Sequence, residues 1–111
     1  MRLLLAFALT LSRSFAATVE SHVKDLIAKY TAARENRDMS TIGALFTEDA
    51  DQLVSQGIWR RGRPALQEGM LQSSMGNPGS RTIPVETVRS VATGVPIADA
   101  LYIVAASPYR P

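Results

Sequence analysis

Side chains that could transfer protons or bind cations are few in this sequence, and the densest group lies at residues 48–51. Glu48, Asp49 and Asp51 place three carboxylates close together, a set suited to acid/base chemistry or to cation binding. The D-x-D-x-D-G spacing of a calcium loop is absent. Capping or solvating a helix end is therefore the favoured interpretation, and acid/base work by Asp49 or Asp51 is the alternative.

Two other residue types limit the chemistry further. His22 is the only histidine and there is no cysteine, so a transition-metal site, a thiol nucleophile and disulfides are not expected. The sequence also contains no P-loop and no G-x-G-x-x-G pattern. We therefore expect no metal and no cofactor.

The stretch GIWRRGRPAL, residues 57–66, joins the only tryptophan to three arginines. Its first glycine suits a hairpin turn, and its second glycine, followed closely by a proline, suits a change from strand to helix. A solvated corner is the favoured interpretation of the arginines, and binding of an anionic ligand by one of them is the alternative. The arginines are Arg60, Arg61 and Arg63.

The N-terminus has the layout of a secretory signal peptide. A basic start is followed by an apolar run over residues 3–11 and by Ser14-Phe15-Ala16, which suits cleavage after Ala16. The run is far shorter than the ~20 residues of a bilayer span, so we expect export to the periplasm or the exterior and no stable membrane span. Without Arg2 and Arg13, ten basic side chains face ten acidic ones. That neutral balance argues against nucleic-acid binding.

Hydrophobic spacing predicts the elements that would position these residues. The first expected helix has an apolar stripe of Val19, Val23, Leu26, Ile27, Tyr30 and Ala33, with Lys24, Asp25, Lys29 and Arg34 on the opposite face. The later elements expected are a short helix capped by Asp38, a hairpin of residues 51–55 and 58–60, a helix opened by Arg63-Pro64 and stopped by the GNPG stretch at 76–79, and strands over 81–91 and 100–106. This order predicts an α+β domain over residues 17–111 with helices on one face of a curved antiparallel sheet.

Two stretches, LIAKYTAARENRDMSTIGALFTEDAD and GIWRRGRPAL, resemble the nuclear-transport-factor-2-like superfamily. The narrower resemblance is to SnoaL-like and SgcJ/EcaC-type proteins, and it spans residues 19–104. It implies a cone-shaped (cystatin-like) sheet around a pocket that binds a small apolar molecule. The pocket residues it implies here are Tyr30, Phe46, Asp51, Val54, Trp59 and Met70.

The resemblance implies acid/base isomerase- or cyclase-type chemistry as one outcome for that pocket. Tyr30 falls where the ketosteroid-isomerase branch has a tyrosine that donates to an oxyanion. The aspartate base of that branch falls at or near Val54 and Ser55, which cannot abstract a proton at neutral pH. Steroid-isomerase chemistry by that route is therefore excluded.

The apolar run ALYIVAA, residues 100–106, is typical of a central strand buried on both faces. In the superfamily that this chain resembles, two further strands follow this one. Here the run is followed by SPYRP, in which Pro108 and Pro111 have no N–H to donate to a neighbouring strand. The expectation is a C-terminally truncated sheet whose apolar edge favours a homodimer. The alternative to ligand binding is thus a non-catalytic dimerisation or interaction domain, or a non-functional fragment.

Overall fold

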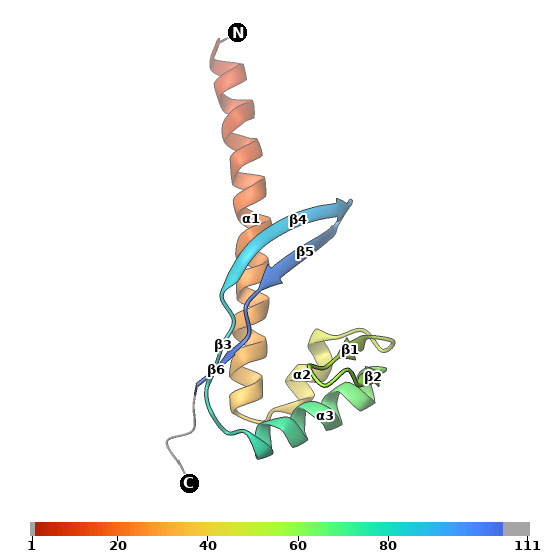
Figure 1. The fold of residues 1–111 in the computed structure, drawn as a ribbon. Coiled ribbons are helices and arrows are strands. Elements are labelled where there is room, and N and C mark those ends of the chain that lie inside the picture. The colour runs from red at the N-terminus through yellow and green to blue at the C-terminus, as the bar shows by residue number, and fades with distance from the viewer. Residues whose placement is uncertain (1, 106–111) are drawn as a thin grey trace.

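A computed structural model describes the backbone of residues 2–105 and the side chains of residues 19–105. The chain has an α+β fold with three helices and small antiparallel sheets (Figure 1). In order, the elements are α1 (Arg2–Glu35), α2 (Met39–Leu45), β1 (Asp51–Leu53), β2 (Trp59–Arg61), α3 (Arg63–Gly76), β3 (Arg81–Thr82), β4 (Val85–Ala92), β5 (Val95–Ala100) and β6 (Ile103–Val104).

The first helix is much longer than the sequence pattern predicted. It runs without a break over 34 residues, through the expected cleavage position after Ala16. The cause is local: residues 3–17 are rich in Leu and Ala and contain neither Gly nor Pro, so nothing in them stops a helix. No helix in the described part of the chain has both the length and the apolar character that membrane crossing requires.

The α1–α2 corner follows the predicted capping chemistry. Arg37 adopts a left-handed backbone with φ of 54° after the last turn of α1, a common way to end a helix. The Asp38 side chain then accepts hydrogen bonds from the backbone N–H of Thr41 at 3.1 Å and from its hydroxyl at 2.6 Å. The cap predicted at Asp38 is confirmed.

A small core lies where the three helices meet. Its buried apolar side chains are Ala33 from α1, Ile42 from α2, and Leu66 and Met70 from α3. Partly buried residues pack around it, among them Tyr30 and Phe46, whose rings meet edge-on at 6.2 Å. This edge-to-face geometry is a preferred one for aromatic pairs. The core holds the C-terminal half of α1 against α2 and α3 (Figure 1).

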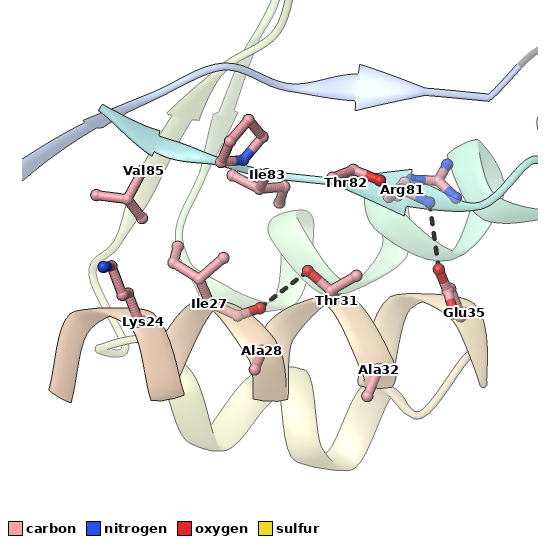
Figure 2. Close-up of a pocket in the computed structure, with 11 residues that line it drawn as sticks. Lys24, Ile27, Ala28, Thr31, Ala32, Glu35, Arg81, Thr82, Ile83 and Val85 are labelled. Atoms are coloured by element: carbon pink, nitrogen blue, oxygen red, sulfur yellow. Dashed lines mark hydrogen bonds between the residues drawn. The ribbon is translucent and has the colours of Figure 1, made fainter. Parts of the chain in front are cut away.

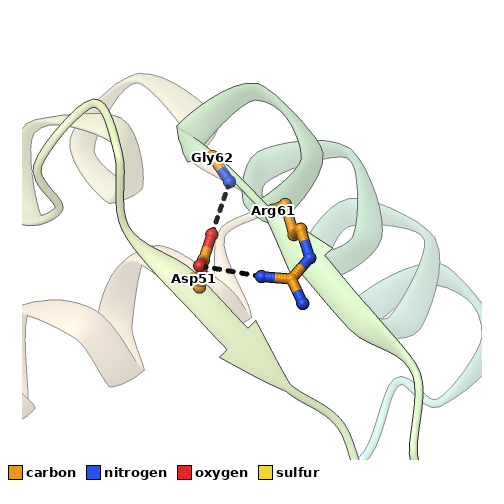
Figure 3. A network of polar contacts seen from close by, with 3 residues as sticks. All are labelled: Asp51, Arg61 and Gly62. Carbon is orange, nitrogen blue, oxygen red and sulfur yellow. Dashed lines mark hydrogen bonds and ion pairs between the residues drawn. The ribbon is translucent and has the colours of Figure 1, made fainter.

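The predicted hairpin and its link to α3 are confirmed. β1 pairs antiparallel with β2, Gly57 takes a φ of 79° in the turn, and Pro64 sits in the first turn of α3. Gly62 joins the strand to the helix with φ of 83° and ψ of 156°. The Asp51 carboxylate accepts a hydrogen bond from the Gly62 N–H at 3.1 Å and pairs with Arg61 at 3.3 Å (Figure 3). The backbone of residues 57–66 therefore forms the turn and the strand-to-helix corner that the sequence predicted.

The C-terminal strands differ from the prediction. The run over 100–106 is not one buried strand: residues 95–100 form β5 and are all exposed, and β6 follows only at Ile103–Val104. The strand expected over 81–91 is likewise divided into β3 and β4 by Ile83-Pro84, and a turn at Thr93-Gly94 joins β4 to β5. A proline has no N–H to donate and interrupts a ladder. The SPYRP tail lies outside the described residues.

The pairing of these strands gives separate ladders in the described part of the chain. β1 pairs with β2, β3 with β6, and β4 with β5, each as a two-stranded antiparallel sheet. β4 and β5 lie beside α1 in Figure 1, well away from β1 and β2. The described ladders are not joined into one continuous curved sheet, and the structure establishes the α+β class.

Candidate functional site

Two of the larger hollows lie between α1 and the C-terminal strands. A groove of about 560 Å³ separates α1 from β3 and the start of β4 (Figure 2). Its polar contacts are local: Thr31 donates to the carbonyl of Ile27 at 2.9 Å, and the Arg81 backbone N–H donates to Glu35 at 3.2 Å. The groove therefore presents a mainly apolar wall, and the contact between Arg81 and Glu35 holds β3 beside the helix.

A second hollow of about 480 Å³ lies between the N-terminal part of α1 and the tip of the β4–β5 hairpin. It includes the only histidine, His22, which is exposed. Within the described residues, no three side chains of His, Cys, Asp or Glu gather closely enough to hold a metal ion. This hollow brings together no set of groups suited to catalysis.

A third hollow, here called the polar cleft, combines charge with burial. It has a volume of about 540 Å³ and is formed by α1, the β1–β2 hairpin, α3 and the segment before β6. Its polar lining differs from the mainly apolar walls of the other hollows. The residues that line it are Tyr30, Arg34, Gln52, Leu53, Val54, Ser55, Gln56, Arg60, Ser73, Asn77 and Tyr102.

An adjacent space of about 270 Å³, here called the apolar hollow, shares three lining residues with the polar cleft. The shared residues are Tyr30, Gln52 and Tyr102. The other side chains are apolar, and the set includes Phe46 and Met70. A molecule with a polar end and an apolar body could therefore contact both spaces at once.

Arg34 is the most unusual group in the polar cleft. Its residue surface is only 3 % exposed. Its Nε donates to the Ser74 hydroxyl at 3.0 Å, and its Nη1 donates to the Tyr30 hydroxyl at 2.8 Å. Both partners are neutral hydroxyls. The sequence analysis placed Arg34 on the solvated face of the first helix, and that placement was wrong. Arg34 follows the buried Ala33 and lies one turn after Tyr30, which carries it into the interface with α3.

Burial raises the pKa of Tyr30 above its ordinary value of 10.0; Arg34 opposes this rise, and the neighbouring Tyr102 adds to it. Tyr30 is therefore an uncharged phenol at neutral pH and does not act as a counter-ion for Arg34. Tyr102 accepts a hydrogen bond from Nε of a second buried arginine, Arg81, at 2.7 Å. Two tyrosine hydroxyls of the cleft are thus each held by a buried guanidinium.

Arg60 reaches the polar cleft from β2. Its Nη1 donates to the Gln52 side chain at 2.9 Å. Its guanidinium end lies against Gly69 of α3, so closely that a Cβ at Gly69 would collide with it. The glycine therefore leaves the space that this side chain occupies.

The structure divides the pocket residues that the sequence analysis proposed. Tyr30 and Val54 line the polar cleft, and Tyr30, Phe46 and Met70 line the apolar hollow. Asp51 and Trp59 line none of the hollows described above. Asp51 pairs with Arg61. Trp59 is 51 % exposed, and the Arg61 guanidinium lies over its ring, 5.0 Å from the ring centroid.

Sequence reasoning missed Arg34, Gln52 and Tyr102 as cleft residues. A usable signal was present for Arg34, because it follows Tyr30 by four residues and so shares its side of a helix. A signal was also present for Gln52, which lies two positions before Val54 in the expected strand and therefore on the same face. Tyr102 carried no signal, since its placement depends on the break between β5 and β6.

No model of a known protein family matches this chain, and no curated protein is significantly similar to it. Function is therefore inferred from the hollows and their side chains.

Proposed function

We propose that this chain is a binding domain for a small molecule with an apolar body, which occupies the apolar hollow and the polar cleft together. The observation that carries the proposal is their shared wall of Tyr30, Gln52 and Tyr102, with apolar side chains on one side and polar ones on the other. Ligand sites commonly combine such an apolar surface with a few placed polar groups.

Binding is favoured over catalysis because the polar cleft contains no evident general base. None of its lining residues is Asp, Glu or His, and the raised pKa of Tyr30 makes its phenol a weaker proton donor. Tyr30 can still orient a carbonyl or hydroxyl of the ligand by a hydrogen bond. Any reaction would be acid/base chemistry that relies on groups of the ligand or on solvent.

The proposal also includes the architecture and compartment expected from the sequence. We propose that the ladders belong to a SnoaL-like cone domain, with residues 1–16 as a signal peptide removed on export. Mass determination of the mature protein from a secreting host tests the second part. A mature chain that begins at Ala17 is expected, and recovery of an uncleaved chain from the cytoplasm would contradict it.

Ligand binding is tested by amide and methyl NMR titration of the protein with naphthalene-1-carboxamide, a neutral aromatic probe. Saturable shifts are expected at Phe46, Met70 and Tyr30. Val54→Trp is expected to weaken them because it fills part of the cleft, whereas Val91→Trp on the exposed face of β4 serves as the control. Shifts confined to β4 and β5, or no saturable shift, would refute the site.

A second candidate function, homodimerisation, is favoured by the β4–β5 hairpin. Every residue of β5 is exposed, and Val91, Val95, Ile97 and Leu101 are large apolar side chains left at the surface. β5 pairs with β4 alone among the described strands, and such an edge is a template for a strand from another copy. Light scattering at several concentrations should show a dimer that Ile97→Lys converts to monomer. If the Ile97→Lys protein is still a dimer, the β5 edge is not the dimer interface.

A further inference from the structure

The polar cleft contains positive charge without a matching negative charge. The only charged side chains that line it are Arg34 and Arg60. The ion pairs within the described part of the chain involve Lys24, Arg61 and Arg63 and neither cleft arginine. All ten Asp and Glu side chains fall within that part of the chain. No carboxylate side chain therefore lies within 4 Å of either cleft guanidinium.

A buried guanidinium without a counter-ion is costly, because hydroxyl partners replace only part of the hydration that is lost. Arg34 has five N–H donors, and its two hydrogen bonds involve Nε and one Nη1 hydrogen. The remaining donors are on Nη1 and Nη2, in a side chain that lines the cleft. A neutral Tyr30 supplies no negative charge. A bound anion would supply the negative charge that the two hydroxyl partners do not.

We propose that the polar cleft is an anion-binding subsite in which Arg34, together with Arg60, grips the carboxylate of the ligand whose apolar body fills the apolar hollow. The inference rests on the proposed function and assigns the ligand to a chemical class: an organic acid with an apolar or aromatic body. Arginine suits this role because its planar fork can donate two parallel hydrogen bonds to one carboxylate.

The positions of the neutral groups fit this assignment. Tyr30 and Tyr102 line both spaces, and their hydroxyls accept hydrogen bonds from Arg34 and Arg81. Gln52 lies at the same boundary and is held by Arg60. A carboxylate at the arginines would thus place the adjoining carbon skeleton next to these groups and directed toward Phe46 and Met70.

The test compares naphthalene-1-carboxylate with naphthalene-1-carboxamide on the full chain by calorimetry at constant ionic strength. The two probes share one apolar body and differ in charge. The carboxylate is expected to bind at least about tenfold more tightly, which corresponds to about 1.4 kcal/mol. 1-Naphthyl phosphate distinguishes a preference for phosphate from one for carboxylate.

Two variants separate the cleft arginines from the rest of the surface charge. Arg34→Met should abolish the difference between the two probes while leaving the protein folded, because a buried cation is replaced by an apolar chain of similar length. Gly69→Ala should reduce the difference by displacing Arg60, without removing any charge or any core residue. Arg61→Met is the control, since Arg61 is exposed and lines none of the hollows described.

A parallel titration follows the side-chain Nε–H signals of the arginines with sulfate alone, which lacks an apolar body. Saturable shifts of the Arg34 signal, with no shift for Arg61, support the anion subsite even if neither naphthalene probe binds; the apolar-body proposal then fails by itself. Equal binding of carboxylate and carboxamide overturns the anion inference and leaves the proposed function standing. No response to any probe overturns both.

Discussion

Replacement of Gly62 by alanine should destabilise the protein through the backbone alone. Gly62 has φ of 83° and ψ of 156°, a region that residues with a Cβ occupy at a cost of about 1–3 kcal/mol. A Cβ built on it finds its nearest neighbours at 3.7 Å, the carbonyl oxygen of Glu48, and at 3.9 Å. Those are ordinary contacts, so the expected loss contains no steric collision.

Both the N–H and the carbonyl of Gly62 are hydrogen-bonded, so its backbone cannot rotate to another conformation without a loss of hydrogen bonds. Its N–H donates to the carbonyl of Ala50 at 2.9 Å and to Asp51 at 3.1 Å, and its own carbonyl accepts from Leu66 at 3.1 Å. An alanine that relaxed into the ordinary β or helical region would disturb these hydrogen bonds. The loss is a large part of the roughly 5–15 kcal/mol that stabilises a typical domain.

The assay is thermal unfolding followed by circular dichroism at the helical band. For a domain of this size, each 1 kcal/mol corresponds to about 4–8 °C, so Gly62→Ala should lower the melting temperature by roughly 5–20 °C. Gly76→Ala is the matched control, because Gly76 ends α3, has open space at its Cβ and lacks a positive φ. A Gly62→Ala protein that melts with the wild type would refute the backbone argument.

Two further predictions concern the helices. Ile42→Ala should cost about 2–5 kcal/mol in urea unfolding, the usual range for emptying a fully buried aliphatic site, whereas Ile58→Ala, at an exposed hairpin position, should cost far less; equal losses would contradict the assigned core. Hydrogen bonds from Thr41 lower the pKa of Asp38 in the folded protein, so its stabilising effect is present above the unfolded-state pKa of about 3.9 and is lost as the pH falls through the lower folded-state value. Asp38→Asn, which keeps a capping oxygen, should therefore reduce the acid-side decline in stability, and an unchanged pH profile would exclude this contribution.

The segment over residues 38–76 was predictable because its signals are local. Asp38 caps α2, Gly57 permits the hairpin turn, and Pro64 starts α3, each through backbone chemistry within a few residues. The C-terminal strands were not predictable in the same way. An apolar run such as 100–106 shows that a segment suits a buried strand, but not whether a neighbour is present to bury it. Residues 100–103 of that run are exposed, and Val104 is half-buried.

The candidate site was predictable in part for a similar reason. Tyr30, Phe46 and Met70 follow helical periodicity into the interior, so their grouping could be inferred from spacing. Arg34 violates the simple rule that arginine belongs on the solvated face of an amphipathic helix. Such violations are where function is expected, because a buried cation reduces stability unless something binds to it. Its burial depends on Ser74, forty residues away in α3, which no local pattern reveals.

The three arginines of GIWRRGRPAL show how one basic stretch serves different ends. Successive side chains of a strand point to opposite faces, so Trp59 and Arg61 share the exposed face of β2 while Arg60 points to the other. Arg61 stacks on Trp59 and pairs with Asp51. Arg63, in the first turn of α3, donates to carbonyls at the end of α2 and approaches Glu48 at 3.6 Å.

Arg60 alone of the three has no carboxylate partner and instead enters the polar cleft. The charge density of the motif therefore says little about a nucleic-acid surface, since two of its three cations are already engaged within the fold. Because side chains alternate along β2, Arg60 is the arginine of this stretch that faces the polar cleft, which the buried Arg34 also lines. A single anionic group in this cleft would neutralise charge from both guanidinium groups, and a wholly apolar ligand would not; the cleft therefore suits an organic acid better.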